Sequence, residues 1–207
     1  MKIISWNVNS VRARIENIKN YIKDSSPDVL LLQEIKTQNE NFPSTEFENL
    51  GYTSHIFGQK SYNGVAIISK LPLEDVVTEL PGDSTDDQAR WLEATIVGDH
   101  AIRMCNLYLP NGNPTPGPKY DYKLKWMHRL YQRAKDLIDS EAPAFMAGDF
   151  NIIPQPEDAA NIDNWEKDAL FLPESRASSS QVIKAFSLAF IPLILKLAIF
   201  TVIASLN

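Results

Sequence analysis

Cysteine and histidine are scarce in this sequence of 207 residues, and acidic residues outnumber basic ones. The single cysteine, Cys105, excludes an internal disulfide; it lies in an apolar run, fits a buried inert thiol and suits a reducing, cytoplasmic setting. A net charge of -6 excludes long-range attraction to nucleic acid, so DNA binding would depend on local basic patches or bound cations. Residues 1–6 lack the apolar stretch that a secretory signal peptide requires.

The first part of the chain predicts alternating strand and helix. Residues 2–6 are short, apolar and favour a strand, and residues 29–32 form a continuous apolar run, as expected for a strand buried on both faces. Between them, Ser10 is expected to cap a helix with one apolar stripe. The stripe consists of Val11, Ile15, Ile18 and Ile22. This order of elements indicates a βαβ-like unit.

The middle of the chain predicts strands separated by turn signals, followed by one long helix. Residues 110–118 form a Pro/Gly/Asn loop, and the helix at 120–138 carries an apolar stripe typical of core packing. Further strands are expected at 65–69, 76–80, 91–97, 102–109 and 144–147. The sequence therefore predicts an α/β (α+β) protein with one core and mixed sheets, for which a layered α/β sandwich is one architecture.

Three polar clusters each follow a predicted strand. Asn7 follows the first strand, Glu34 the second, and Asp149 with Asn151 the strand at 144–147. Ligand sites form at the carboxyl ends of strands in open α/β sheets. Carboxylate and amide oxygens suit Mg²⁺ or Mn²⁺ and not zinc, which prefers nitrogen and sulfur. Taken singly, each cluster also fits a solvated turn or a helix cap, so the predicted metal site depends on the three ends meeting.

Six short motifs follow one another at set distances along the chain. They are WNVNSVR at 6–12, LQEIK at 32–36, YNGVAI at 62–67, QAR at 88–90, YLPNG at 108–112 and GDFNI at 148–152. In order and spacing they resemble the exonuclease III family of abasic-site (AP) endonucleases, from Met1 to about Ala177. The wider superfamily shares the glutamate and the Asp-x-Asn pair, whereas LQEIK, NGVA and QAR point to its DNA-repair branch.

The resemblance implies a layered sandwich of the endonuclease/exonuclease/phosphatase (DNase I-like) type. It also implies a monomeric enzyme that hydrolyses double-stranded DNA at abasic sites and 3′ ends with Mg²⁺, Mn²⁺ being an alternative. In this family pattern Glu34 is the main metal ligand with Asn7 beside it, Asp149 orients or activates the nucleophile, and Asn151 positions the nucleophile and the phosphate.

Three further residues receive roles from the resemblance. Tyr108 would contact the scissile phosphate or assist the leaving group, while Arg90 and Asn111 would touch the DNA backbone. From the residues alone, Tyr108 could equally pack at a strand edge and Arg90 could pair with a nearby acid. A basic group at the start of the long helix fits either a DNA-facing patch or a solvated helix face. This group consists of Lys119, Lys123, Lys125 and Arg129.

The chain departs from the family pattern in its last part. The family has a catalytic histidine after an aspartate on its final strand, but the only histidines here are His55, His100 and His128, and none is placed in that way. We therefore expect little activity, since losing a general base costs about 10²–10⁴-fold in rate. An inactive DNA- or metal-binding remnant is the alternative.

Composition changes abruptly at Ser178. Residues 178–207 contain no acidic residue, and residues 185–206 are apolar and long enough to span a bilayer, although Pro192 and Lys196 oppose insertion. We expect residues 1–177 to form an incomplete catalytic domain and residues 178–207 to be an aberrant tail from a shifted reading frame. A membrane tail on a phosphoesterase and a divergent core element are the alternatives.

Overall fold

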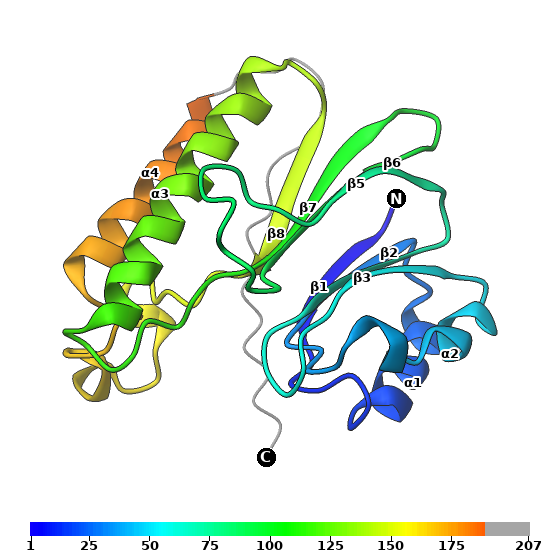
Figure 1. The fold of residues 1–207 in the computed structure, drawn as a ribbon, viewed down its shortest axis with the longest axis horizontal. Helices are drawn as coiled ribbons and strands as arrows, with labels where there is room; N and C mark the ends of the chain where they lie inside the picture. The colour runs from blue at the N-terminus through cyan, green and yellow to red at the C-terminus, as the bar shows by residue number, and fades with distance from the viewer. Residues whose placement is uncertain (189–207) are drawn as a thin grey trace.

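The computed structural model describes residues 1–188, with side chains described for residues 1–182. Two four-stranded sheets pack face to face, and helices cover the outer face of each sheet (Figure 1). Helices α1 and α2 lie on one side of the molecule and α3 and α4 on the other. This is the layered α/β sandwich that the sequence predicts.

The first sheet has the strand order β1-β2-β4-β3. Strands β1 and β2 are parallel and are joined through α1, so the predicted βαβ unit is confirmed. Strand β4 pairs antiparallel with β2 and β3 and is buried along its whole length. The elements of this half are β1 (Ile3–Asn7), α1 (Ile15–Ser25), β2 (Val29–Gln33), a 3₁₀ turn (Asn39–Asn41), α2 (Ser44–Glu48), β3 (Thr53–Phe57) and β4 (Val65–Ser69).

The second sheet has the strand order β5-β6-β7-β8. Strands β5, β6 and β7 form an antiparallel meander, and β8 returns parallel to β7 after the long helix α3. The elements are β5 (Leu73–Val77), β6 (Trp91–Ile96), β7 (Ile102–Tyr108), α3 (Pro118–Asp139), β8 (Ala144–Asp149), 3₁₀ turns (Pro156–Asp158 and Ile162–Trp165) and α4 (Pro173–Leu188). The predicted metal site therefore lies at the carboxyl ends of two parallel strand pairs, β1/β2 and β7/β8.

The core consists of three apolar layers, one between each pair of neighbouring structural layers. Ile18 and Ile22 bury the α1 face against the first sheet, as their spacing predicts, and Val11, which precedes the helix, is buried in the same layer. Two other buried groups fill the space between the sheets and the space under α3. Cys105 belongs to the last group, is fully buried, and has its thiol pKa raised by that burial, so the prediction of a buried inert thiol is confirmed.

Some local predictions are wrong. Ser10 does not cap α1, which begins at Ile15, because the Ser10 amide donates to the Glu34 carbonyl (2.7 Å) and its φ is 89°. Strand β5 lies three residues before the predicted strand at 76–80. Strand β3 and helix α2 are short elements that the apolar pattern does not reveal.

The expected domain boundary after Ala177 falls inside α4. Val182, beyond that position, is buried in the layer under α3. Most of the apolar segment 185–206 lies outside the described residues. Within the described part of the chain, none of the helices combines the length and the apolar character that crossing a membrane requires.

A buried carboxylate joins the second sheet to α3. Glu93 on β6 is 1% exposed and pairs with Arg103 of β7 and Arg133 of α3. Burial by itself raises the pKa of Glu93, but the hydrogen bonds from Arg133 and Arg103 outweigh it and hold the pKa below its ordinary value of 4.5. The ionised form is therefore the one that stabilises the fold.

Replacing Glu93 by glutamine is expected to lower the free energy of unfolding by about 3 kcal/mol at pH 7, because it leaves two arginines without their buried partner. The wild-type group contributes stability above pH 4.5 and loses it as the pH falls through its lower folded-state pKa. Urea unfolding at several pH values measures this: the gap between the two proteins should narrow below pH 4.5. A gap that is unchanged at low pH would contradict the assignment.

Candidate active site

The three predicted strand ends meet at one point. The side-chain amide of Asn7, at the end of β1, donates to Glu34 Oε1 (2.8 Å) and to Asp149 Oδ2 (2.8 Å). Glu34 follows β2, and Asp149 ends β8 in the other sheet. One amide therefore joins two carboxylates from opposite sheets, 27 and 142 residues away in sequence.

Each strand end turns through an unusual backbone conformation. Asn9, Glu34 and Asn151 have φ values of 43°, 51° and 46°, in the left-handed region that non-glycine residues rarely adopt. Such conformations cost about 1–3 kcal/mol each and are concentrated at functional sites. In all three clusters the chain therefore turns sharply at the strand end, which is where the polar side chains lie.

Close packing of β8 against β7 places Asp149 opposite Tyr108. Gly148 permits it: a side chain there would put its Cβ 1.9 Å from the Leu107 carbonyl oxygen, so only glycine fits. Beyond the strand, the Asn151 amide nitrogen of the backbone donates to Asp149 Oδ1 (2.9 Å), and its side chain donates to the Leu109 carbonyl (2.8 Å). Asp149 and Asn151 are both buried and held rigidly on one side of the segment.

The two carboxylates differ in their electrostatics. Burial raises the pKa of Asp149, and this outweighs its hydrogen bonds to Asn7 and Asn151. Glu34 is half-buried; burial opposes its ionisation, but hydrogen bonds from Asn7, Lys36 and Tyr108 together lower its pKa. Lys36 Nζ lies 2.8 Å from Glu34 Oε2. Glu34 is thus held as an anion, whereas Asp149 is closer to the range in which a carboxylate can exchange protons with a substrate.

Tyr108 and Arg90 stack beside the carboxylates. The Arg90 guanidinium carbon lies 4.9 Å from the centre of the Tyr108 ring, and its Nη1 donates to the Tyr108 carbonyl (3.2 Å). Burial raises the pKa of Tyr108, and the Glu34 charge adds to this effect, so the phenol stays protonated and can donate a hydrogen bond. Among the described residues Arg90 forms no ion pair, which removes the alternative that it simply neutralises an acid.

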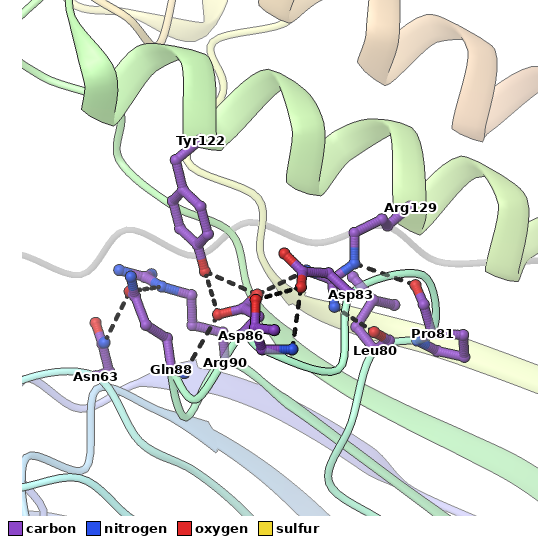
Figure 2. Close-up of polar contacts among 10 residues, drawn as sticks. Asn63, Leu80, Pro81, Asp83, Asp86, Gln88, Arg90, Tyr122 and Arg129 are labelled. Atoms are coloured by element: carbon purple, nitrogen blue, oxygen red, sulfur yellow. Dashed lines mark hydrogen bonds and ion pairs between the residues drawn. The ribbon is translucent and has the colours of Figure 1, made fainter.

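A hydrogen-bonded chain fixes the segment that carries Arg90 (Figure 2). Two side chains of α3 hold Asp86: the Tyr122 hydroxyl donates to it (2.9 Å), and Arg129 Nη1 lies 2.7 Å away. Two residues on, Gln88 Oε1 accepts from Arg90 Nε (2.8 Å) and from the Asn63 side chain (3.3 Å). The orientation of Arg90, which directly precedes β6, is therefore set in part by α3.

The donor set fits a hard divalent cation in chemical type. It offers the carboxylates of Glu34 and Asp149 and the amides of Asn7 and Asn151, with no nitrogen or sulfur ligand. Asn7 turns its side-chain nitrogen toward both carboxylates, while its oxygen accepts from the Asn9 amide (3.1 Å). The Asn7 oxygen could therefore join a cation between the carboxylates only after the side-chain amide turned. Within residues 1–188 no three His, Cys, Asp or Glu side chains converge, so a cation here would depend on water and substrate oxygens for its remaining ligands.

A groove of about 510 Å³ runs beside these residues. Asn111 lies exposed in it, where its side chain accepts hydrogen bonds from Asn113. The groove is lined by Gln59, Tyr62, Asp87, Gln88, Arg90, Pro110, Asn111, Gly112, Asn113, Lys119 and Tyr122. The lining places the predicted DNA-contacting residues Arg90 and Asn111 along one groove, and Arg90 also stacks on Tyr108.

The predicted basic patch on the long helix is only partly correct. Lys119 lines the groove and Lys125 is exposed, but Arg129 is committed to Asp86 and Lys123 is fully buried. The sequence prediction placed Lys123 in a basic patch and missed that it is buried, although its position on the helix indicates burial. Buried positions of α3 recur every three or four residues, and 123 falls on that stripe; they are Tyr120, Lys123, Trp126, Met127, Leu130, Ala134 and Leu137.

Comparison with known proteins agrees with this geometry. Residues 4–193 match the model of the endonuclease/exonuclease/phosphatase family. The chain is 36% identical over 187 residues to exodeoxyribonuclease III of Haemophilus influenzae, a match that covers 86% of this chain and 69% of the relative. It is 27% identical to a DNA-(apurinic or apyrimidinic site) endonuclease of Dictyostelium discoideum, covering 89% of this chain and 51% of that protein.

Solved structures of similar proteins lead to the same group. An AP endonuclease from Archaeoglobus fulgidus superposes with a TM-score of 0.82 at 34% identity, covering 89% of this chain and 70% of that one. A 3′-5′ exonuclease from Neisseria meningitidis gives a TM-score of 0.84 at 34% identity, with coverages of 89% and 71%. The chain therefore belongs to the endonuclease/exonuclease/phosphatase family and, within it, to the exonuclease III and AP endonuclease group of hydrolytic phosphodiesterases.

Proposed function

We propose that this chain is a DNA-repair nuclease that hydrolyses phosphodiester bonds of double-stranded DNA at abasic sites and 3′ ends, as a monomer and with Mg²⁺ or Mn²⁺. The observation that carries the proposal is the meeting of Glu34 and Asp149 on the Asn7 amide, with Tyr108 and Arg90 beside them. Relatives whose names specify exodeoxyribonuclease and AP endonuclease activity, and a related Neisseria 3′ phosphatase solved with a product DNA hairpin, support the choice of DNA.

The residues divide the work of phosphodiester hydrolysis. Glu34, the more acidic carboxylate, would hold the metal, which when bound supplies positive charge to the phosphoryl oxygens. Asp149, with its raised pKa, would orient the attacking water and take its proton. Asn151 is fixed beside it and would position the water and phosphate, while the protonated Tyr108 hydroxyl would donate to the phosphate or to the leaving oxygen.

The rate is expected to be low. His55 lies on β3 and His100 and His128 are exposed, so in the described part of the chain no histidine reaches the carboxylates. If a histidine normally takes the proton, its loss lowers the rate by about 10²–10⁴-fold. The metal, Asp149 and Tyr108 would sustain the remaining activity.

A panel of labelled DNA substrates tests the proposed function. With enzyme in excess and Mg²⁺ present, a duplex with one abasic analogue and a duplex with a recessed 3′ end should be cleaved faster than an intact blunt duplex or a single strand. Equal cleavage of all four would argue for an unspecific phosphodiesterase. Salt-sensitive binding to DNA with no cleavage of any substrate would instead identify an inactive binding remnant.

Replacing Arg90 by alanine is expected to weaken DNA binding about tenfold, because one charge-assisted contact to a phosphate is lost. The slope of log affinity against log salt should fall in magnitude by about 1. Fluorescence anisotropy at several salt concentrations measures both quantities. Lys135→Ala, an exposed position on α3, serves as the control and should change neither; an unchanged slope for Arg90→Ala would remove Arg90 from the DNA contact.

Two further expectations stay proposals. The cytoplasmic setting is supported by Cys105, which is buried and has no disulfide partner.

The shifted reading frame at residue 178 is supported by the abrupt loss of acidic residues, whereas the burial of Val182 under α3 favours a native core element at that position. Sequencing the gene through codons 170–207 decides between them: a single inserted or deleted base is expected for a shifted frame.

A further inference from the structure

Lys123 is a fully buried lysine whose ammonium group has no carboxylate at ion-pair distance among the described residues. Burying such a charge is costly unless each of its donors is satisfied. Here all three are: Nζ donates to the carbonyls of Asn151 (2.7 Å), Ala169 (3.0 Å) and Asn111 (3.1 Å). An ammonium group has three donors, so the site uses the whole of its hydrogen-bonding capacity.

The three carbonyls belong to segments that are distant in sequence. Asn111 lies in the loop after β7 that lines the groove (residues 110–113, the groove loop). Asn151 lies in the segment after β8 (residues 150–153, the catalytic segment), and Ala169 precedes α4. The Lys123 Nζ atom therefore binds all three segments.

Other contacts show that this junction is built closely around the lysine. Gly112, with φ 94°, packs on the lysine stem, and a Cβ there would lie 2.7 Å from Lys123 Cδ. Asn113 links the groove loop to the third segment: its side chain accepts from the Ala169 amide (3.0 Å) and donates to Asp168 (2.9 Å). Leu109, just before the groove loop, is also held to the catalytic segment, by the Asn151 side chain (2.8 Å) and by its own amide on the Asp149 carbonyl (2.8 Å). Lys123 extends this connection to Asn111.

We propose that Lys123 is a positioning residue that fixes the groove loop carrying Asn111 relative to the catalytic segment carrying Asn151. It touches neither DNA nor the reacting atoms; it acts through two backbone carbonyls. The part of this inference that concerns catalysis rests on the proposed function. With the two segments fixed relative to each other, a DNA strand bound by the groove loop lies at one defined position relative to Asp149 and Asn151.

Hydrogen–deuterium exchange of the full chain tests the tether without requiring activity. Lys123→Met keeps the length of the side chain and removes the three donors, so exchange in segments 110–113 and 150–153 should rise about tenfold or more. Leu130→Ala is the matched control, because Leu130 is buried on the same helix and takes part in none of the three hydrogen bonds of the tether. The control should lower the melting temperature while leaving exchange in both segments at the wild-type rate.

Cleavage and binding measurements separate positioning from general stability. Lys123→Met should lower the single-turnover cleavage rate about 10²-fold, as misplacement of about 1 Å does in other enzymes. The Kd for abasic duplex should change less than about threefold, because every DNA-facing group is retained. Leu130→Ala should change neither value at temperatures where it is folded. If Lys123→Met does not fold, Lys123→Gln replaces it, with at least about threefold faster exchange expected, since an amide has only two donors.

The outcomes are distinguishable. Exchange in both segments that matches the wild type, or that rises equally in Leu130→Ala, overturns the proposal for Lys123. If the wild-type chain cleaves no DNA while exchange responds as expected, the tether stands and the proposed function fails.

Discussion

Replacing Asp149 by asparagine is expected to lower the rate of Mg²⁺-dependent DNA cleavage by about 10²-fold or more. The asparagine keeps the shape of the side chain and an oxygen that can accept from the Asn151 amide, so the fold should be retained. What is lost is the charge: Asp149 is the buried carboxylate with the raised pKa, and it lies two residues before Asn151 and opposite Tyr108. Single-turnover cleavage of an abasic duplex measures the effect.

Asp163→Asn provides the control for Asp149, since it makes the same chemical change at an exposed position in the 3₁₀ turn Ile162–Trp165. The control should cleave at the wild-type rate and melt at the wild-type temperature. An Asp149→Asn protein that retains wild-type activity would mean that another group activates the water, and that the cluster at the strand ends serves the fold alone.

Replacing Glu34 by glutamine is expected to weaken divalent-metal binding by about 100-fold or more, since even indirect partners of metal ligands typically account for about 10–100-fold. Glu34 is the carboxylate kept anionic by Asn7, Lys36 and Tyr108, although it lies half-buried. Its amide counterpart would still accept the Asn7 hydrogen bond but would carry no charge. Titration with Mn²⁺, followed by calorimetry or by its paramagnetic signal, measures the affinity directly.

Lys36 competes with a metal ion for the Glu34 carboxylate. Lys36 Nζ occupies Glu34 Oε2 at 2.8 Å, so a cation must displace it or share the carboxylate with it. Glu48→Gln on α2, an exposed position, is the control for Glu34→Gln and should bind metal as the wild type does. Wild-type affinity in Glu34→Gln would place the metal elsewhere, and Asp149 would then be the remaining candidate ligand.

The sequence predicts the meeting of the three strand ends because its physical basis is local. Asn7, Glu34 and Asp149 each follow a continuous apolar strand, and parallel strands deliver their carboxyl ends to one edge of a sheet. The meeting of two sheets adds what no local pattern contains: Asn7 and Asp149 face each other across the sandwich because β1 and β8 lie in different sheets.

The supports of the site were harder to predict because a charged residue in a helix or loop usually faces water. Lys123 and Arg129 both read as members of a basic face, yet one is buried against three carbonyls and the other holds Asp86. The carbonyls bound by Lys123 lie 12, 28 and 46 residues away in sequence, and Asp86 lies 43 residues from Arg129, so only tertiary structure reveals these partners. Asn106 is similar: it lies in an apolar strand but hydrogen-bonds Gln33 (2.7 Å) between the two sheets.

Single-turnover cleavage of an abasic duplex by the 207-residue chain, with exodeoxyribonuclease III of Haemophilus influenzae as the reference, tests the central claim most directly. We expect cleavage at the abasic position that requires Mg²⁺ and stops with EDTA. It should be slower than the reference by about 10²–10⁴-fold, because no described histidine reaches the site. Cleavage that persists in EDTA, or no cleavage at any excess of enzyme, would contradict it.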